Sequence, residues 1–387
     1  MKKIGLITHY GENYGGMLQA YALQRCVKEE GYDCHIISND FLYQKAPVSK
    51  IKRLKNKLKK IIKNPISSVK RSRAMHLYDE EKKLRSARFR EFASKNLVVD
   101  QTGYTCYEQY VEAPPEYDVY LCGSDQIWNP NLYNKNGFCF AGFAPEESVK
   151  ISYASSLGVS SVTEQQAAFM KPYLQRLDVI STRESEGSKI VEDLTGKPVR
   201  TVLDPTLLLN AEQWDDVAAK PLIKQPYVFC YLFGERDYIA RVKKQIKELT
   251  GMETVCLPYV AREMAGDDVK IFDAGPAEFV SLIKNAALVV TDSFHATAFS
   301  VNLKTPFISL CRFSKNDAIS MNSRMTTILG TVGLMDRLID EEDEITKDML
   351  FNIDFEKAHE LLRARREEDI DFLKNAIEYE RKKENKN

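Results

Sequence analysis

The sequence predicts an α/β protein with two Rossmann-like domains whose parallel sheets face an interdomain cleft. Its 387 residues are more than one core usually accommodates. From residue 3 onward, short apolar segments alternate with stretches of helical periodicity, a pattern typical of parallel sheets. The alternation breaks at 211–225 and then resumes, which indicates a linker near Gln225 between two strand–helix sets.

The domain limits follow from this organisation. We expect an N-terminal Rossmann-like domain at 1–215, with a basic helical insertion at about 50–95, and a C-terminal Rossmann-like domain at 216–345. A charged helix is expected within 346–387. Two open sheets that present their strand ends to one cleft form a GT-B-like architecture, which many group-transfer enzymes use.

The N-terminal domain opens with a βαβ unit. Lys3–Thr8 is a predicted strand, His9–Gly16 a glycine-rich turn, and Met17–Glu30 a helix that Gly31 ends. Further strands are predicted at Cys34–Ile37, Asp118–Gly123, Ile151–Ala154, Asp178–Ser181, Pro198–Leu203, Tyr227–Phe233, Thr254–Pro258, Lys270–Phe272, Leu288–Thr291 and Phe307–Cys311.

The basic insertion is unusual in composition. Residues 50–73 hold eleven Lys or Arg and no acid, and the apolar residues of 51–62 share one helical face. A basic amphipathic helix at 50–63 could dock on an anionic membrane surface. Packing against the N-terminal domain is the alternative. A second, mixed-charge helix is predicted at Asp79–Ser94.

The overall composition excludes several functional classes. Lys+Arg and Asp+Glu are balanced at 55 each, so nothing favours nucleic acid as a partner. The eight cysteines contain no C-x-x-C spacing, and we expect reduced thiols, no metal and no cofactor. No segment approaches the roughly 20 apolar residues that span a bilayer. We therefore expect a cytoplasmic location, with peripheral contact at the inner membrane face as one interpretation of the basic helix.

The segment AALVVTDSFHATAFS, 286–300, is the strongest functional signal. An apolar strand ends at Thr291, and Asp292 or Ser293 can cap the helix that follows. His295 therefore lies at the carboxyl end of a strand and the start of a helix, where open α/β sheets bind ligands and where free N–H groups favour anions. The alternative is a histidine that caps local backbone.

Two further clusters follow strand ends in the N-terminal half. Arg183 with Glu184 suits bidentate binding of phosphate or carboxylate, although a surface Arg–Glu pair is an equal alternative. In residues 123–128, glycine permits close approach, Asp125 offers a base and Trp128 offers a stacking face. A buried turn with a core tryptophan explains this cluster equally well.

Basic residues follow the last predicted strand. Lys315 lies shortly after Phe307–Cys311, and Arg324 begins an apparent helix. Either side chain could close over an anion held at His295, whereas a solvated helix start is the usual explanation for a single arginine.

Six segments in order resemble the polysaccharide pyruvyl transferase family, over a region from Lys3 to about Leu334. They are NYGGMLQAYALQ (13–24), DVYLCGSDQIWNP (118–130), SYASSLG (152–158), STRESEG (181–187), LDPTLLL (203–209) and TDSFHATAFS (291–300). The resemblance implies a GT-B-like fold that transfers a pyruvyl group from phosphoenolpyruvate to a sugar, usually as a ketal bridging two hydroxyls. Ser293-Phe294 stand where the family often has an arginine before the histidine.

The resemblance also implies roles for individual residues. It implies donor binding and catalysis for His295, and a part for a downstream basic residue, either Arg324 or Lys315. From the chemistry of the side chains we further expect Asp125 as a catalytic residue and Arg183 and Ser293 as donor-binding residues. The residues expected to bind the acceptor are Asn13, Tyr14, Gly15, Ser124, Gln126 and Trp128. The donor is expected on the C-terminal domain and the acceptor on the N-terminal domain.

The implied partners are phosphoenolpyruvate, as a co-substrate, and a sugar or lipid-linked oligosaccharide of a surface polysaccharide such as a capsule or exopolysaccharide. Two alternatives stay open. A glycosyltransferase using a nucleotide sugar would need a nucleobase pocket and a ribose-binding acid, for which 273–276 is the available segment. A non-catalytic relative could close on a ligand without turnover.

Overall fold

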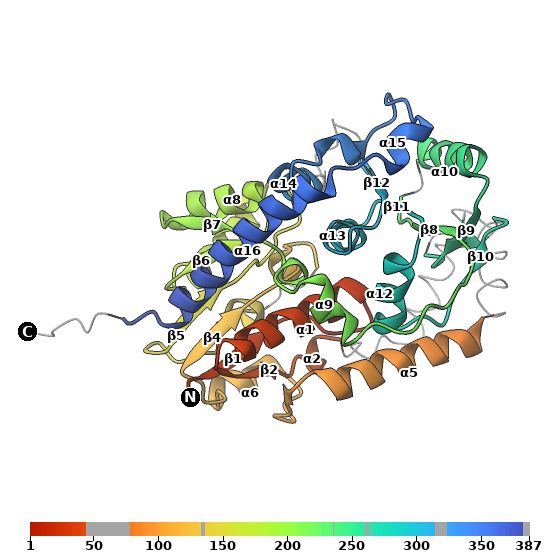
Figure 1. The fold of residues 1–387 in the computed structure, drawn as a ribbon. Coiled ribbons are helices and arrows are strands. Elements are labelled where there is room, and N and C mark those ends of the chain that lie inside the picture. Colours follow the sequence, from red (N-terminus) through yellow and green to blue (C-terminus); the bar gives the residue numbers. More distant parts are fainter. Residues whose placement is uncertain are drawn as a thin grey trace, which may run out of the picture.

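The described residues form two large parallel β-sheets and a two-stranded one, with helices around them (Figure 1). The structure, a computed structural model, describes residues 1–43, 78–132, 136–234, 236–259, 263–264, 266–313 and 323–381. The predicted basic helix at 50–63, with its membrane contact, and Lys315 lie outside these residues. No helix in the described ranges is both long and apolar enough to cross a bilayer.

The first sheet comes from the N-terminal half. Its strands, in spatial order, are β3 (Val99–Asp100), β2 (Asp33–Ile37), β1 (Lys3–Ile7), β4 (Val119–Cys122) and β5 (Val149–Ser152), all parallel. A parallel pair, β6 (Ile180–Thr182) and β7 (Val199–Thr201), continues beside β5 through a bridge from Ile151 to Val179. The order reverses at β1 and β4, which is where open α/β sheets form binding crevices.

The second sheet comes from the C-terminal half. Its strands, in spatial order, are β10 (Val269–Lys270), β9 (Glu253–Cys256), β8 (Tyr227–Tyr231), β11 (Leu288–Thr291), β12 (Phe307–Leu310) and β13 (Leu338–Ile339), also all parallel. Every residue of β8, β11 and β12 is buried, which explains why these strands appear in the sequence as continuous apolar runs. The predicted α/β class with two Rossmann-like sheets is confirmed.

Helices connect the strands. Those of the first half are α1 (Tyr14–Glu29), α2 (Asp40–Tyr43), α5 (Asp79–Asn96), α6 (Tyr107–Glu112), α7 (Glu164–Leu174), α8 (Ser185–Thr195) and α9 (Ala211–Asp215). Those of the second half are α10 (Asp237–Thr250), α12 (Pro276–Lys284), α13 (Phe294–Asn302), α14 (Ser323–Thr331), α15 (Lys347–Phe351) and α16 (Phe355–Ile377).

Helix α1 begins earlier than its apolar pattern predicts. The Asn13 side chain accepts a hydrogen bond from Gly16 N at 2.9 Å and so caps the helix. Tyr14, Gly15 and Gly16 therefore form its first turn rather than part of a glycine-rich loop, which corrects the predicted start at Met17.

The two sheets share an apolar contact. One continuous core cluster contains Leu6 of β1 and Phe229 of β8. Tyr14 of α1 stacks on Phe279 of α12, with ring centroids 4.6 Å apart and an interplanar angle of 11°. Its hydroxyl donates to Ala274 O at 2.7 Å. The two halves are therefore packed directly against each other at this junction.

Two helices cross this junction (Figure 1). On α5, Arg85 donates to Glu12 O at 3.1 Å, and Arg88 pairs with Asp273 at 3.0 Å. Helix α16 returns from the second sheet to the first, where Lys2 pairs with Glu378, just beyond its end, at 2.6 Å. Both helices therefore restrain the position of one sheet relative to the other.

Asp369 is the main buried anchor of α16. Its fully buried carboxylate accepts from Leu203 N at 2.8 Å and pairs with Arg365 at 2.9 Å and with Arg200 at 3.2 Å. Asp369→Ala leaves a buried N–H without an acceptor, so we expect a loss of about 2–3 kcal/mol, measured as a lower melting temperature by calorimetry.

Glu368→Gln is the matched control, because Glu368 also pairs with Arg200 but is 62% exposed. We expect it to cost no more than about 0.5 kcal/mol. Equal melting temperatures for Asp369→Ala and Glu368→Gln would contradict the anchoring role.

Candidate active site

His295 lies between the two sheets. It is in the first turn of α13, directly after β11, and only 9% of it is exposed. Its Nε2 is 3.6 Å from Asp204 Oδ2 of the N-terminal half. Its ring lies against Gly15 so closely that a Cβ at Gly15 would be 2.0 Å from Nδ1. The imidazole is therefore held from two sides by residues of the other half of the chain.

Asp204 holds its position through the Asp-Pro-Thr turn that follows β7. Its Oδ1 accepts from Thr206 N at 3.0 Å and from Thr206 Oγ1 at 2.7 Å. Its Oδ2 accepts from an Arg183 guanidinium N–H at 2.7 Å. Burial alone would raise the pKa of Asp204, but His295 and then Arg183 outweigh it and hold the pKa below its ordinary value. Asp204 is therefore a fixed negative charge.

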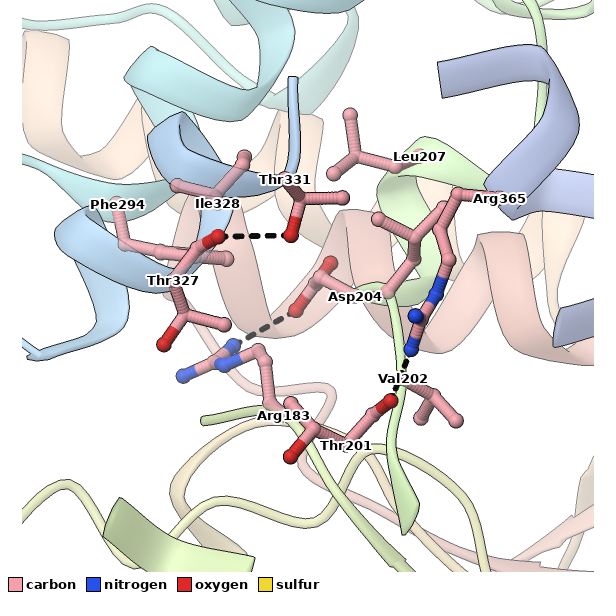
Figure 2. A pocket seen from close by; sticks show the side chains of 11 residues that line it. Arg183, Thr201, Val202, Asp204, Leu207, Phe294, Thr327, Ile328, Thr331 and Arg365 are labelled. Carbon is pink, nitrogen blue, oxygen red and sulfur yellow. Dashed lines mark hydrogen bonds and ion pairs between the residues drawn. The ribbon is translucent and has the colours of Figure 1, made fainter. Parts of the chain in front are cut away.

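Arg183 pairs with the Asp204 carboxylate (Figure 2) and also with a second carboxylate, that of Asp125. It follows β6, donates to Asp125 Oδ1 at 3.2 Å, and stacks over the Phe294 ring at 4.3 Å from the centroid. Its side chain is only 1% exposed. Arg183, which we expect to bind the donor, does not line the interdomain space described below; its guanidinium contacts Asp204, Asp125 and the Phe294 ring.

Asp125 projects from an irregular turn after β4. Its φ of 62° places a non-glycine residue in the left-handed region, a conformation that clusters at functional sites. Burial would raise its pKa, but Arg183 and then His295 hold the pKa of Asp125 below the ordinary value. The carboxylate is 15% exposed and borders two cavities.

The first cavity lies between the sheets and has a volume of about 370 Å³. It brings together residues of both halves: Asn13, Gly15, Asp125, Gln126, Tyr231, Phe233, Tyr259, Phe279, Ser293, Phe294, His295, Arg312 and Arg324. We call it the interdomain cavity. Seven of the predicted site residues therefore converge here: Asn13, Gly15, Asp125, Gln126, Ser293, His295 and Arg324.

Arg324 lies in the first turn of α14 and is only 9% exposed. Burial, and then repulsion from Arg183, lowers the pKa of Arg324 to about 10. An anion beside this guanidinium would act in the opposite direction and favour its charged form. Of the two predicted downstream cations, Arg324 lines the interdomain cavity, while Lys315 is outside the described residues.

Arg312 is a cationic wall residue that was not predicted to bind a ligand. It donates to the backbone oxygen of Asp292 at 2.7 Å and pairs with the Asp292 carboxylate at 3.2 Å. That carboxylate also accepts from Phe233 N at 2.9 Å and from Gly234 N at 2.6 Å. Ser293, not Asp292, occupies the N-cap position of α13, and its side chain makes no capping hydrogen bond. Asp292 therefore fixes Arg312 rather than the helix start.

A second cavity of about 520 Å³ adjoins the first on the N-terminal side. Asn13, Asp125 and Gln126 border both, and His9, Glu12 and Leu132 line the second. Burial lowers the pKa of His9 to about 4, although Asp125 acts in the opposite direction. His9 is therefore neutral at neutral pH. We call this space the N-terminal cavity.

Three residues predicted to bind the acceptor line neither cavity. Trp128 is fully buried, donates to Cys139 O at 3.0 Å and stacks on Phe140, so the alternative of a core tryptophan is the one observed. Ser124 is also fully buried and donates to Ala154 O at 2.8 Å. Tyr14 belongs to the junction described above. All three support the site through packing.

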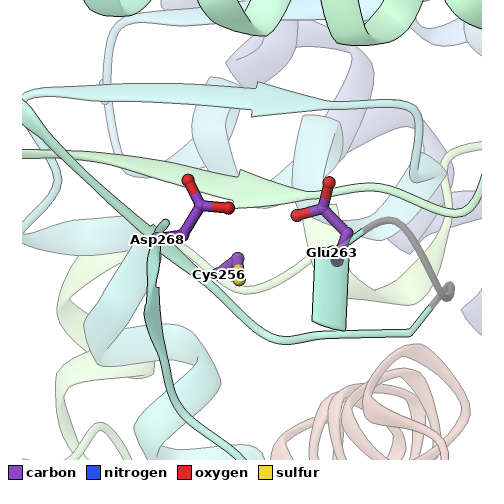
Figure 3. A group of neighbouring side chains, drawn as sticks. All are labelled: Cys256, Glu263 and Asp268. Carbon is purple, nitrogen blue, oxygen red and sulfur yellow. The ribbon is translucent and has the colours of Figure 1, made fainter. Parts of the chain in front are cut away.

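A separate cluster contains Cys256, Glu263 and Asp268 beside β9 (Figure 3). Its ligand-type atoms lie within 4.8 Å of one another, but Lys243 pairs with Glu263 at 2.9 Å and with Asp268 at 2.6 Å. Burial raises the pKa of the Cys256 thiol, which disfavours the thiolate that binds metals. The lysine already neutralises the acids, so we assign no metal to this cluster.

Several solved structures match most of this chain at low sequence identity. Solved structures with similar folds include UDP-GlcNAc 2-epimerase from Methanocaldococcus jannaschii, at 13% identity over 94% of this chain and 92% of that chain, with a TM-score of 0.46. The S. aureus MnaA–UDP co-structure has 12% identity over 98% and 96%, with a TM-score of 0.48. An alpha-glucosyltransferase (AGT) in complex with UDP has 11% identity over 98% and 100%, with a TM-score of 0.48. No curated protein matches the sequence significantly.

Two parallel Rossmann-like sheets with a polar cavity between them define a GT-B-like protein. The family model "Polysaccharide pyruvyl transferase" matches residues 13–310. The chain therefore belongs to the polysaccharide pyruvyl transferase family, a family of transferases, as the six sequence segments indicated.

The role of Asp204 can be tested through pH. Because its folded-state pKa is depressed, its stabilising contribution is present above the unfolded value of about 3.9 and is lost as the pH falls below it. Asp204→Asn should therefore be about 3 kcal/mol less stable than the wild type at pH 7, and the difference should narrow below about pH 4. Calorimetric melting temperatures across this range measure it.

Asp193→Asn is the control, because Asp193 pairs with Lys189 on an exposed surface. It should show almost no difference from the wild type at any pH. A deficit for Asp204→Asn that is as large at pH 3 as at pH 7 would argue against a fixed negative charge.

Proposed function

We propose that this protein transfers the pyruvyl group of phosphoenolpyruvate to a sugar of a surface polysaccharide or its precursor and forms a pyruvate ketal. The observation that carries the proposal is the interdomain cavity. His295, Arg312 and Arg324 line it from the C-terminal half, and Asp125 faces it from the N-terminal half. Cations opposite a carboxylate suit an anionic donor beside a hydroxyl-bearing acceptor.

The donor fits the cationic side. Phosphoenolpyruvate carries a carboxylate and a phosphate, and guanidinium groups bind both kinds of anion with charge-assisted hydrogen bonds. Arg324 is the first candidate, since an anion would favour its charged form, and Arg312 is the second. Arg183 contributes indirectly, by holding Asp125 and Asp204 in place.

The chemistry follows from the groups present. Protonated His295 donates a proton to the methylene carbon of phosphoenolpyruvate, which makes the neighbouring carbon electrophilic. A sugar hydroxyl attacks that carbon while Asp125 accepts the hydroxyl proton. Inorganic phosphate leaves, and a second hydroxyl closes the ketal as its proton is released. The acceptor would extend from the N-terminal cavity into the interdomain cavity, since the two spaces share Asn13, Asp125 and Gln126.

A cytoplasmic location would suit this reaction, because phosphoenolpyruvate is a cytoplasmic metabolite. Nucleotide-sugar transfer and non-catalytic binding remain the competing functions. They differ in the ligand that stabilises the protein, because binding to the folded state raises the melting temperature.

Substitution of Arg324 and of His295 should separate donor binding from the chemical step. We expect phosphoenolpyruvate to stabilise the wild type in thermal-shift assays and UDP-GlcNAc not to. Arg324→Gln should weaken phosphoenolpyruvate binding at least tenfold, by about 1.4 kcal/mol. His295→Ala should lower phosphate release in the presence of methyl hexopyranosides by about 100-fold.

His35→Ala and Arg241→Gln are controls of the same residue types away from both cavities, and both should behave as the wild type. Near-normal binding and turnover for Arg324→Gln and His295→Ala reject the assigned roles. Stabilisation by UDP-GlcNAc in place of phosphoenolpyruvate rejects the proposed function itself.

The contact between Gly15 and His295 offers a second test. A methyl group at Gly15 would overlap the imidazole, whereas one at Gly16 would meet its nearest neighbour at 3.5 Å. Gly15→Ala must therefore displace His295 and should reduce turnover by about 100-fold, while Gly16→Ala should stay within about threefold of the wild type. Equal turnover for the two variants, at equal melting temperature, would contradict the placement of the imidazole.

A further inference from the structure

Tyr259 is an exposed aromatic residue on the wall of the interdomain cavity. It follows β9, and 61% of its surface is accessible. Tyr231, Phe233 and Phe279 line the same side, so the C-terminal wall is aromatic as well as cationic. Tyr231 and Phe279 are buried and serve the core. Tyr259 is the most exposed of these four aromatic residues.

The ring is supported from behind. Phe233 packs against it, with centroids 4.5 Å apart and an interplanar angle of 61°. Phe233 in turn packs on Tyr231 at 4.8 Å, and the Arg312 guanidinium lies 4.6 Å from the Phe233 centroid. Since Asp292 fixes Arg312, the orientation of Phe233 is set by its neighbours. The Tyr259 ring therefore packs on a neighbour, Phe233, whose own orientation is fixed.

The opposite wall is polar. Gln126 accepts from Asn129 through Oε1 at 2.7 Å, and its amide nitrogen has no partner among the described residues. The Asn13 side chain is exposed and borders the same space. A ligand between these walls therefore meets an aromatic ring on one side and an amide donor and the Asp125 carboxylate on the other.

From this arrangement we infer that Tyr259 is the stacking platform for the pyranose ring of the acceptor. The inference rests on the proposed function. It adds a residue that determines acceptor specificity and that belongs to the C-terminal half, although the acceptor was expected on the N-terminal domain. A hexopyranose has an apolar C–H face and a rim of hydroxyls, which match the aromatic and the polar wall. Phosphoenolpyruvate has no ring, so the platform serves the second substrate.

The competing occupant is a nucleobase, which also stacks on aromatic rings. Tyr259 shares its cavity with His295 and Arg324. A group stacked on it therefore lies beside the groups that would hold the donor anion. This position suits an acceptor ring about to react, because its hydroxyls must reach the donor.

Saturation-transfer difference NMR tests the platform. The probes are methyl hexopyranosides of gluco, galacto and manno configuration, each with the wild type, Tyr259→Ala, Tyr259→Phe and Tyr379→Ala. Tyr379, 39% exposed and outside both cavities, is the matched control. We expect at least one hexopyranoside to bind the wild type through its ring C–H protons. Its affinity for Tyr259→Ala should be about tenfold lower, and its affinities for Tyr259→Phe and Tyr379→Ala should lie within about threefold of the wild-type value.

Phosphoenolpyruvate thermal shifts, recorded on the same proteins, separate this inference from the proposed function. Unchanged phosphoenolpyruvate stabilisation in Tyr259→Ala with weakened hexopyranoside binding supports the platform. Hexopyranoside binding that is equal in the wild type and Tyr259→Ala, or absent from the wild type, overturns it even when phosphoenolpyruvate binds. UDP binding that depends on Tyr259 overturns the sugar platform in favour of a nucleobase site. If phosphoenolpyruvate does not stabilise the wild type, the proposed function itself is overturned.

Discussion

The carboxylate of Asp204 is the charge on which the rest of the site depends. It belongs to the N-terminal half, yet it is the nearest acid to His295, which belongs to the C-terminal half. Its other contacts are the Thr206 turn and the Arg183 guanidinium. Because Arg183 also holds Asp125, one buried negative charge determines where the imidazole and the second carboxylate lie relative to each other. A buried ion pair of this kind is costly to break, since removal of one partner leaves the other uncompensated.

This electrostatic arrangement requires that the two halves keep a fixed position relative to each other. Apolar packing at their junction holds them in that position. Tyr14 stacks on Phe279 across the junction, and α5 and α16 cross it on the outside. The aromatic contacts and the two helices hold the halves together, and within that frame the buried charges fix the geometry of the site. Tyr14 and Trp128, whose sequence positions suggest ligand binding, are buried and contribute to this packing instead.

Much of the fold could be predicted because strand-forming patterns depend on local sequence. The buried strands β8, β11 and β12 appear as continuous apolar runs, and each ends close to where the pattern ends. His295 and Asp125 could be predicted for a related reason, since both follow a strand directly and strand ends in parallel sheets converge. The start of α1 was missed because a side-chain cap at Asn13, not hydrophobic periodicity, determines it.

The remaining parts of the site depend on contacts between segments far apart in sequence. Nothing local distinguishes Asp204 from any other Asp-Pro turn, and its role arises from Arg183 and His295 arriving from other elements. Arg312 and Tyr259 line the cavity because β12 lies beside β11 and β9 lies beside β8, which the order of strands along the chain does not reveal.

The cap at Asn13 has a consequence for the site as a whole. Helices α1 and α13 both begin at the interdomain cavity, where Asn13, Gly15, Ser293 and His295 lie. The peptide dipoles of both helices therefore point their positive ends into the same space. Unlike histidine, backbone N–H groups do not titrate, so this part of the attraction for an anion persists at every pH at which the fold persists.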